Sequence, residues 1–546
     1  MRTTSTGWRP RRVAAALGLG LAFTGLLATA APATAARTAT DPSVVNTTHG
    51  KVRGTVSPGL RTFEGIPYAA PPVDELRWTS PQPATAWTGV RDATAPGPAC
   101  AQPVGLAIGV PSNNEDCLYL NVTAPTKTKA KAKAKQPVIV WIHGGSMMYG
   151  TGDMYGPDRL AAEGAVVVSM NYRLGVFSFL TDRVLDGPKA TYGSGSFGLE
   201  DQQAALRWVR ENIAAFGGDP RNVTIMGQSG GGYAVCDHLA SPVSAGLFNR
   251  AIIQSAACAT DGSSSRTRAE AEADSDDVIK LDECADASDL PACLRTVDVE
   301  VLLAKYGQWE DGELKEPRPV TGTKLLPLSP AEAIRTGRFN RVPVLVGVNH
   351  DEENGMVGAQ ELAPDGAPMA PEAYEPAIRA QFGTDADAVL RQYPLHRFGS
   401  AGEALAAVKT DAKWSTPTLD TARLLSRWTT TRMYEFAEKD TPWFEGMDYP
   451  SFPMNAQHMA ELAYLFDLDL FQDLTDEQAK LRTRMISTWV RFAAVGNPNG
   501  GGERAWPQFR GETPSGWYVQ SLTAGPWQST AFAQDHGYSF WKSLAA

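Results

Sequence analysis

Apolar runs bounded by glycine and polar residues are the strongest pattern in this chain. Two of them, at 137–142 and 164–170, are almost unbroken, and shorter ones lie within 247–255 and 341–347. A strand of a parallel sheet is buried on both faces, so it has a continuous apolar run where a half-exposed strand alternates. These runs therefore predict the buried strands of a mostly parallel sheet.

Helical patterns separate the predicted strands. An apolar stripe at helical spacing runs through 199–213, and 355–445 has the patterns of several helices, which we expect to form a cap more than a core. Residues 44–78 predict short N-terminal strands. This order predicts an α/β fold, in which a large, mostly parallel central sheet is flanked by helices and carries helical cap insertions. We expect residues 37–546 to form a single domain.

A serine lies in a glycine-rich turn directly after a short apolar run. The sequence at 227–231 is Gly-Gln-Ser-Gly-Gly, which has the form G-x-S-x-G with Ser229 at its centre. Small neighbours let the backbone turn sharply from strand into helix, which exposes the hydroxyl at the carboxyl end of the sheet. Ser229 is therefore the candidate nucleophile, although a tight turn that needs glycine at positive φ explains the motif about equally well by itself.

A serine nucleophile needs a base to remove its proton and an acid to orient that base. After this type of turn, the order along the chain is serine, then Asp or Glu, then histidine. That order leaves His350, His396, His458 and His536 as candidate bases. His350 lies only two residues before the best acid, Glu352, and His396 and His536 lie in stretches without a pattern.

Composition and charge exclude some classes of partner. Of the 546 residues, 43% are hydrophobic and 20% are charged, and the formal net charge is −10, so nothing favours a nucleic-acid partner. A lysine-rich insert at 126–136 predicts a solvated loop, with a patch for anionic cell-wall polymers as the alternative.

The first 36 residues have the pattern of a signal peptide. Four arginines precede an apolar run at 13–30, and small residues follow for cleavage near Ala35/Ala36. We expect a secreted, extracellular protein, with the export route left open between a general and a twin-arginine signal. The apolar run is short and interrupted, so we expect no stable membrane insertion after signal removal.

Six cysteines in an exported chain favour disulfides over metal ligands, because no C-x-x-C pair or zinc-spaced histidine cluster is present. Cys100 with Cys117, and Cys284 with Cys293, would each close a short loop, worth about 3 kcal/mol apiece. For Cys236 and Cys258, a disulfide and two buried free thiols are equally good interpretations.

Separate motifs across most of the chain resemble those of the type-B carboxylesterases, which include bacterial p-nitrobenzyl-type esterases, animal carboxylesterases, cholinesterases and some fungal lipases. The likeness runs from residue 44 to residue 506. It is carried by Phe-Glu-Gly-Ile-Pro-Tyr-Ala at 63–69, Glu-Asp-Cys-Leu-Tyr-Leu-Asn at 115–121, Asn-Tyr-Arg-Leu-Gly at 171–175, Phe-Gly-Gly-Asp-Pro at 216–220 and Trp-Val-Arg-Phe-Ala at 489–493. The resemblance implies an α/β-hydrolase fold.

The resemblance also implies the roles of individual residues. Ser229 matches the nucleophile, Glu352 the acid and His458 the general base, and Ser255 is expected to support this triad indirectly. The oxyanion donors match the backbone N–H groups of Gly145, Ser146 and Gly230. The family's two disulfides and two buried ion pairs match Cys100–Cys117, Cys284–Cys293, Arg77 with Glu115 and Arg173 with Asp201.

The chain departs from the family pattern beside these residues. Gln228 replaces a glutamate before the nucleophile, Gly230 replaces an alanine after it, Ser146 replaces the third glycine of a His-Gly-Gly-Gly motif, and Glu353 replaces a glycine after the acid. None of these changes removes a catalytic group. The neutral Gln228 is expected to alter the pKa of His458 or the fit for cationic substrates.

The resemblance implies a secreted serine esterase that forms an acyl-enzyme on Ser229 and acts on a small-molecule ester without metal or cofactor. One alternative is a lipase for acylglycerols, because apolar residues recur within the loop at 104–110. Another is a catalytically silent binding module on the same fold. The loop at 100–117 has no aromatic residue for a quaternary ammonium, which argues against a choline ester. The sequence sets neither the acyl chain length nor the oligomeric state.

Overall fold

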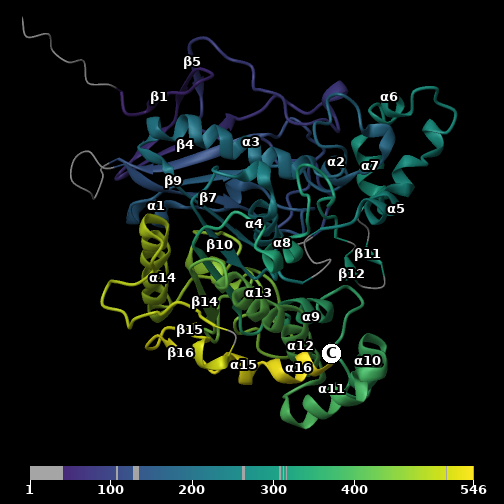
Figure 1. Ribbon diagram of the computed structural model, residues 1–546, viewed down its shortest axis with the longest axis vertical. Coiled ribbons are helices and arrows are strands. Elements are labelled where there is room, and N and C mark those ends of the chain that lie inside the picture. The colour runs from purple at the N-terminus through teal and green to yellow at the C-terminus, as the bar shows by residue number, and fades with distance from the viewer. Residues whose placement is uncertain are drawn as a thin grey trace, which may run out of the picture. The chain divides into compact units, whose positions relative to one another are not determined.

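An 11-stranded mixed sheet lies at the centre of the computed structural model (Figure 1). The structure describes residues 41–105, 108–126, 135–260, 265–306, 309–310, 313–314, 316–511 and 513–544. The predicted signal peptide and almost all of the lysine-rich insert lie outside these residues. Pro42–Ala546 form one compact unit.

The strands between β15 and β8 run parallel to their neighbours, and the strands outside them are antiparallel. Small separate sheets are formed by β1 (Val44–Asn46), β2 (Lys51–Arg53) and β5 (Val90–Asp92), and by β11 (Trp309–Glu310) and β12 (Glu313–Leu314). The order across the large sheet is β16 (Gln528–Ser529), β15 (Val519–Leu522), β14 (Thr431–Phe436), β13 (Val344–Asn349), β10 (Arg250–Gln254), β9 (Gly218–Gln228), β7 (Gln136–Ile142), β8 (Val166–Met170), β6 (Tyr119–Pro125), β4 (Leu60–Pro67) and β3 (Thr55–Ser57).

Both faces of the parallel strands are buried, as the continuous apolar runs predict. Along β7, Val138 belongs to one hydrophobic core, whereas its neighbour Ile139 belongs to another. Successive side chains of a strand point to opposite faces, so each core needs its own apolar set. Leu206 of α3 (Phe197–Asn212) packs in the first core and Trp489 of α14 (Asp476–Val495) in the second, which gives the helix-flanked sheet that the sequence predicts.

None of the helices among the described residues has the length and apolar character needed to cross a membrane. They are α1 (Asp158–Glu163), α2 (Gly175–Phe179), α3 (Phe197–Asn212), α4 (Gly230–Ala240), α5 (Arg268–Ile279), α6 (Leu290–Leu294), α7 (Val299–Lys305), α8 (Pro330–Thr336), α9 (Asn354–Glu361), α10 (Pro371–Phe382), α11 (Ala386–Gln392), α12 (Ala401–Lys409), α13 (Thr416–Ser426), α14 (Asp476–Val495), α15 (Phe532–Asp535) and α16 (Tyr538–Leu544).

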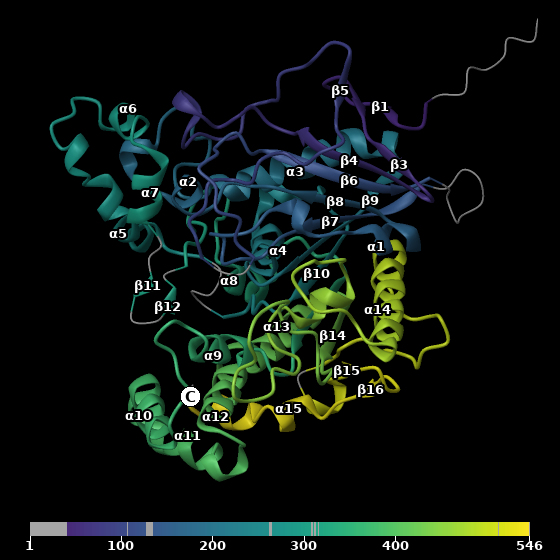
Figure 2. The ribbon, with the colours of Figure 1, turned by 180° about the vertical axis from the view of Figure 1, so that it is seen from behind.

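The helical cap includes the end of the chain. Helix α16 lies beside α10, α11 and α12 in Figure 1, and the view from behind shows α10, α11 and α12 grouped next to the yellow C-terminal part of the ribbon (Figure 2). They share a hydrophobic core that contains Tyr374, Val389, Leu405 and Trp541. The C-terminal helix is therefore part of the cap, a contact that no local pattern indicates.

Residues 355–445 are mostly helical, as the sequence predicts, but they also contain one strand of the central sheet. Strand β14 lies there, completely buried, and pairs with β13 and β15. Its apolar run is broken by Arg432, which donates to the carbonyl oxygens of Trp506 and Gly496, and by Glu435. Because these charged groups find partners inside the protein, the strand is buried without being continuously apolar.

All six cysteines form disulfides. The structure joins Cys100 to Cys117 and Cys284 to Cys293, which confirms the two implied pairings. It also joins Cys236 in α4 to Cys258 after β10, which decides the pairing that the sequence left open.

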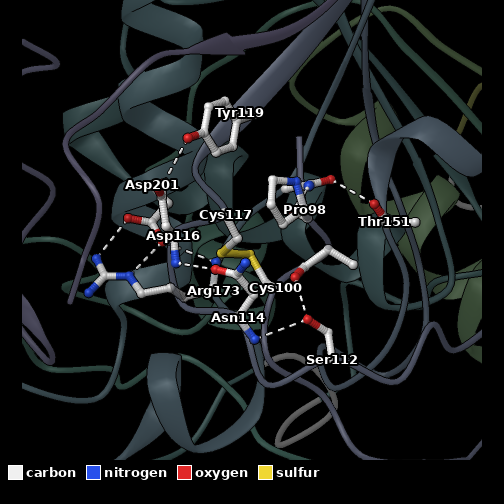
Figure 3. Close-up of a disulfide and its surroundings, with 12 residues drawn as sticks. Pro98, Cys100, Ser112, Asn114, Asp116, Cys117, Tyr119, Thr151, Arg173 and Asp201 are labelled. Atoms are coloured by element: carbon white, nitrogen blue, oxygen red, sulfur yellow. Dashed lines mark hydrogen bonds and ion pairs between the residues drawn. A yellow bond between two sulfur atoms is a disulfide. The ribbon is translucent and has the colours of Figure 1, made fainter. Parts of the chain in front are cut away.

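A buried ion pair lies beside the Cys100–Cys117 bridge (Figure 3). The Arg173 guanidinium donates two hydrogen bonds to Asp201, of 2.8 and 2.7 Å, and the Arg173 backbone N–H donates a third of 3.1 Å. The side chains are 3% and 0% exposed. The pair therefore ties the loop after β8 to α3, as the resemblance implies.

We expect Asp201→Asn to lower the free energy of unfolding by about 3–5 kcal/mol, because it leaves the Arg173 charge buried without a counter-charge. The matched control is Asp276→Asn, which removes a carboxylate from an exposed pair with Lys280 and should change stability by less than about 1 kcal/mol. Urea unfolding followed by circular dichroism measures both. Equal losses in the two variants would contradict a structural role for the buried pair.

Candidate active site

Ser229 lies at a strained turn between β9 and α4. Its backbone has φ 54° and ψ −124°, a conformation that non-glycine residues adopt rarely and chiefly where the surroundings impose it. The Ser229 N–H donates to Gln254 O, and its carbonyl accepts from the Tyr233 N–H. These bonds hold the serine at the carboxyl end of the parallel strands, where open α/β sheets place their ligands.

The glycines around Ser229 are required by close backbone contacts. A Cβ atom on Gly231 would clash with the carbonyl oxygen of Ile142 at the end of β7, and one on Gly227 would clash with the carbonyl oxygen of Gly231. A Cβ on Gly144 would lie 2.7 Å from the carbonyl oxygen of Gln228. The turn can therefore pack against the end of β7 only without side chains at these positions.

His458 and Glu352 are hydrogen-bonded to each other. The His458 Nδ1–H donates to Glu352 Oε2 at 2.5 Å, and the His458 backbone N–H donates to the Glu352 carbonyl oxygen at 3.0 Å. The other carboxylate oxygen of Glu352 accepts from the Asn349 N–H at 2.8 Å. Glu352 follows β13, so this pair forms at the same edge of the sheet as Ser229.

The other nitrogen of His458 faces the serine turn. Its Nε2 atom lies 3.3 Å from the side-chain nitrogen of Gln228, the residue before Ser229. The Trp414 ring packs on the imidazole with ring centroids 4.8 Å apart. The imidazole is thus held between Glu352 on one side and the serine turn on the other.

Buried charge sets the electrostatics of the site. Burial alone would lower the pKa of His458, but the negative charge and hydrogen bond of Glu352 outweigh it and raise that pKa above the ordinary value. A second carboxylate, Glu461, accepts hydrogen bonds from Asn349 and Gln254. Burial, reinforced by the charge of Glu352, raises the pKa of Glu461 to about 7.

A loop with unusual backbone lies against Gly230. Gly145, Ser146 and Met147 all have positive φ, at 97°, 54° and 59°. A Cβ on Gly230 would lie 3.0 Å from the backbone nitrogens of both Ser146 and Met147. Backbone N–H groups therefore converge beside the N-terminus of α4, which is a suitable arrangement for stabilising an oxyanion.

His143, just before this loop, is a structural residue. Its Nδ1–H donates to Gly144 O at 2.9 Å, and its ring stacks on Tyr172 with centroids 4.4 Å apart. Burial lowers the pKa of His143 to about 4, so the ring is neutral at pH 7. It supports the turn at which the loop begins.

Ser146, which replaces the third glycine of the family's His-Gly-Gly-Gly motif, has a specific hydrogen-bond partner. The Ser146 hydroxyl donates to Glu316 Oε1 at 2.6 Å, and Glu316 forms an ion pair with Arg318. The Arg318 guanidinium in turn lies over the Tyr233 ring, 5.0 Å from its centroid. A chain of polar contacts thus joins the oxyanion loop to the first turns of α4.

The structure brings most of the expected residues together. Gln228, Glu352 and His458 lie together at one edge of the sheet, beside the turn that bears Ser229, and Ser146 lies against Gly230. Ser255 is 1% exposed, and its hydroxyl has no hydrogen-bond partner among the described residues, so its supporting role stays a prediction.

Sequence reasoning missed several residues at the site, among them Met147, Glu316 and Trp414. Met147 is the neighbour of an expected oxyanion donor, which was a usable signal. Glu316 and Trp414 lie in irregular and helical segments without a pattern that points to the site.

Among the described residues, one group of histidine and glutamate side chains has the spacing of metal ligands. It consists of His350, Glu435 and His536, and none of these belongs to the expected triad.

Comparisons with known proteins show the family of this chain. The model of the carboxylesterase family matches residues 41–541. The para-nitrobenzyl esterase of Bacillus subtilis (strain 168) is 36% identical over 491 residues, which cover 86% of this chain and 93% of that protein. A cocaine esterase of Oryctolagus cuniculus is 35% identical and covers 85% of this chain and 90% of its own length.

Solved structures show the same fold. A thermophilic PNB esterase superposes with a TM-score of 0.74 at 32% sequence identity, and covers 92% of this chain and 100% of its own. Another PNB esterase has a TM-score of 0.73 at 33% identity, with 91% and 100% covered. The α/β-hydrolase fold that the sequence implies is therefore confirmed.

Two adjacent glycines of α4 provide a test of the backbone contact. We expect Gly231→Ala to lower the free energy of unfolding by about 3 kcal/mol, because its Cβ must displace backbone atoms at the end of β7. Gly230→Ala, with the same gain in helix propensity, should stay within about 1 kcal/mol of the wild type, since its neighbours need to move only slightly. Urea unfolding compares them, and similar stabilities would disprove the contact.

Proposed function

Because the chain belongs to the carboxylesterase family and is a carboxylic ester hydrolase, we propose that it forms an acyl-enzyme on Ser229, with His458 as base and Glu352 as its acid partner. The observation that carries this proposal is the position of His458. Its Nδ1–H is held by Glu352, and its Nε2 faces the turn that bears Ser229. This is the orientation that a base needs to accept the serine proton.

In the proposed acylation step, Ser229 Oγ attacks the ester carbonyl carbon while its proton moves to His458 Nε2. The imidazolium that forms is stabilised by Glu352, 2.5 Å from Nδ1. Negative charge develops on the carbonyl oxygen, where backbone N–H groups of Ser146 and Gly230, with Gly145 as a further donor, stabilise it. The intermediate then expels the alcohol, which takes its proton from His458 Nε2.

Deacylation repeats these steps with water. His458 removes a proton from water, which attacks the acyl carbon, and the second intermediate expels Ser229 Oγ. The serine recovers its proton from the imidazolium, and the carboxylic acid leaves. Each bond that forms or breaks involves only substrate, water and the side chains of this site.

We further propose that the protein is secreted and acts outside the cell. Support comes from the first 36 residues and from the three disulfides, which persist in oxidising compartments. The loop at 100–117 exposes Val104 (83%) and Val110 (38%), which favours a lipase-like preference for longer acyl chains as the second candidate.

The first test is hydrolysis of p-nitrophenyl esters from acetate to palmitate. We expect Ser229→Ala to lower kcat by roughly 10⁴–10⁶, as for the loss of other serine nucleophiles, and Ser543→Ala, on the exposed surface of α16, to leave it unchanged. Residual activity of Ser229→Ala near the wild-type level would exclude the acyl-enzyme. A rate that rises with chain length would favour the lipase alternative.

The second test concerns the charge next to His458. Catalysis requires the neutral imidazole, so kcat/KM should fall as pH falls through the raised pKa of His458. Gln228→Glu places a carboxylate beside Nε2 and stabilises the protonated ring, which should move this acidic limb to higher pH by about 1 unit.

The matched variant is Gln228→Met, which removes the amide without adding charge and should leave the acidic limb near its wild-type position. Measurement of kcat/KM from pH 5 to pH 9 separates the two effects. Coincident pH profiles for the two variants would show that charge at residue 228 does not act on the base.

A further inference from the structure

A second cluster of ionisable side chains lies at the carboxyl end of the neighbouring strands. His350 directly follows β13, Glu435 lies near the end of β14, and His536 directly follows α15. Strands β13 and β14 are parallel, with Asn349 opposite Phe436, so the residues at their ends meet at one edge. The residue after α15 supplies the third side chain, from a segment far along the chain.

The three side chains direct potential ligand atoms at one point. His536 Nε2 is 2.7 Å from Glu435 Oε1, His350 Nε2 is 4.0 Å from the same oxygen, and one ligand atom of each residue lies within 4.8 Å of the others. Ligand atoms bound to one tetrahedral zinc ion, at about 2.0–2.1 Å each, lie about 3.3 Å apart. The observed 2.7 and 4.0 Å separations bracket that value, so small side-chain shifts would accommodate an ion.

Each imidazole has a carboxylate on its other nitrogen. His536 Nδ1 is 2.5 Å from Asp411 and His350 Nδ1 is 3.1 Å from Asp351. A carboxylate on the far nitrogen is what metal-binding histidines almost always have, because it sets the tautomer and aims the free nitrogen at the metal. Asp411 is itself held by the Tyr393 hydroxyl at 2.7 Å.

Charge and exposure fit a cation. Three carboxylates surround two histidines in a region where the Glu435 and His536 side chains are only 2% and 4% exposed, and a bound ion would replace the His536 Nε2 proton that Glu435 accepts as a hydrogen bond at 2.7 Å. The His350 side chain is 45% exposed and connects the cluster to solvent. The exposed side of His350 therefore gives an ion a route of entry.

We propose that His350, Glu435 and His536 bind one divalent transition-metal ion of the zinc class. Two imidazole nitrogens with one carboxylate oxygen select such an ion over Ca²⁺ or Mg²⁺, which prefer sites made of oxygen atoms. His350 and Asp351 directly precede Glu352, so a bound ion ties the loop of the expected catalytic acid to β14 and α15. The ion takes no part in the ester chemistry proposed above, and the site stands independently of it.

Isothermal titration of ZnCl₂ into the chelator-treated full protein, produced without a polyhistidine tag, tests the site. We expect one ion per chain and a rise in melting temperature with zinc, because the ion binds the folded state. His350→Gln removes a half-exposed ligand, should fold normally, and should weaken zinc binding at least tenfold. Asp411→Asn should weaken binding by about 10–100-fold through His536.

The matched control is His396→Gln, which removes a histidine outside the cluster and should leave zinc affinity unchanged. Visible absorption of the Co²⁺-loaded protein reports the ligand geometry, and its characteristic bands should be lost in His350→Gln. Absence of zinc binding by the wild type overturns the proposal. Equal zinc affinities of His350→Gln and His396→Gln overturn it as well.

Discussion

The close backbone contact between the start of α4 and the end of β7 is the constraint on which the site depends. Gly231 lies against the carbonyl oxygen of Ile142, where no side chain fits. That contact lets the chain reverse at Ser229 with a strained φ of 54° and brings Gly230 to the amide groups of Ser146 and Met147. A nucleophile and an anion-stabilising loop from different strands can meet only because the backbones approach this closely.

Two opposed electrostatic effects set the pKa of His458, the expected base. Burial by itself disfavours a charged imidazole, and the Glu352 carboxylate 2.5 Å away favours it more strongly. Glu461, behind this pair, has its own pKa raised to about 7 by burial and by Glu352. The pair thus lies in a region where the cost of each charge depends on its neighbours, as is common where acid–base chemistry takes place.

One edge of the sheet carries both the expected catalytic residues and the proposed metal ligands. Side chains at the carboxyl ends of parallel strands point into the same space, whichever strand they follow. Glu352 and His350 are two residues apart after β13, yet Glu352 bonds to His458 and His350 faces Glu435. Two residues of the same turn therefore belong to separate clusters.

The sequence alone predicted the buried strands other than β14, the helix-flanked sheet and the glycine-rich turn at Ser229. A strand that is buried on both faces must be apolar throughout unless its charges are paired, and a turn with backbone contacts must be built from glycine. Both requirements concern a residue and its neighbours along the chain, so they are visible as a local pattern in the sequence. The roles of Glu352 and His458 came from resemblance to a family, not from such a pattern.

Only the tertiary structure decided the Cys236–Cys258 bridge, the buried strand β14, the contact of Ser146 with Glu316 and the cluster of His350, Glu435 and His536. In each case the partner lies far along the chain or in an irregular segment. Arg432 and Glu435 interrupt the apolar pattern of β14, because the carbonyl oxygens that bind Arg432 and the imidazole that binds Glu435 come from distant segments. Pairing of polar groups depends on the distances that packing sets between segments, and a single sequence carries no record of those distances.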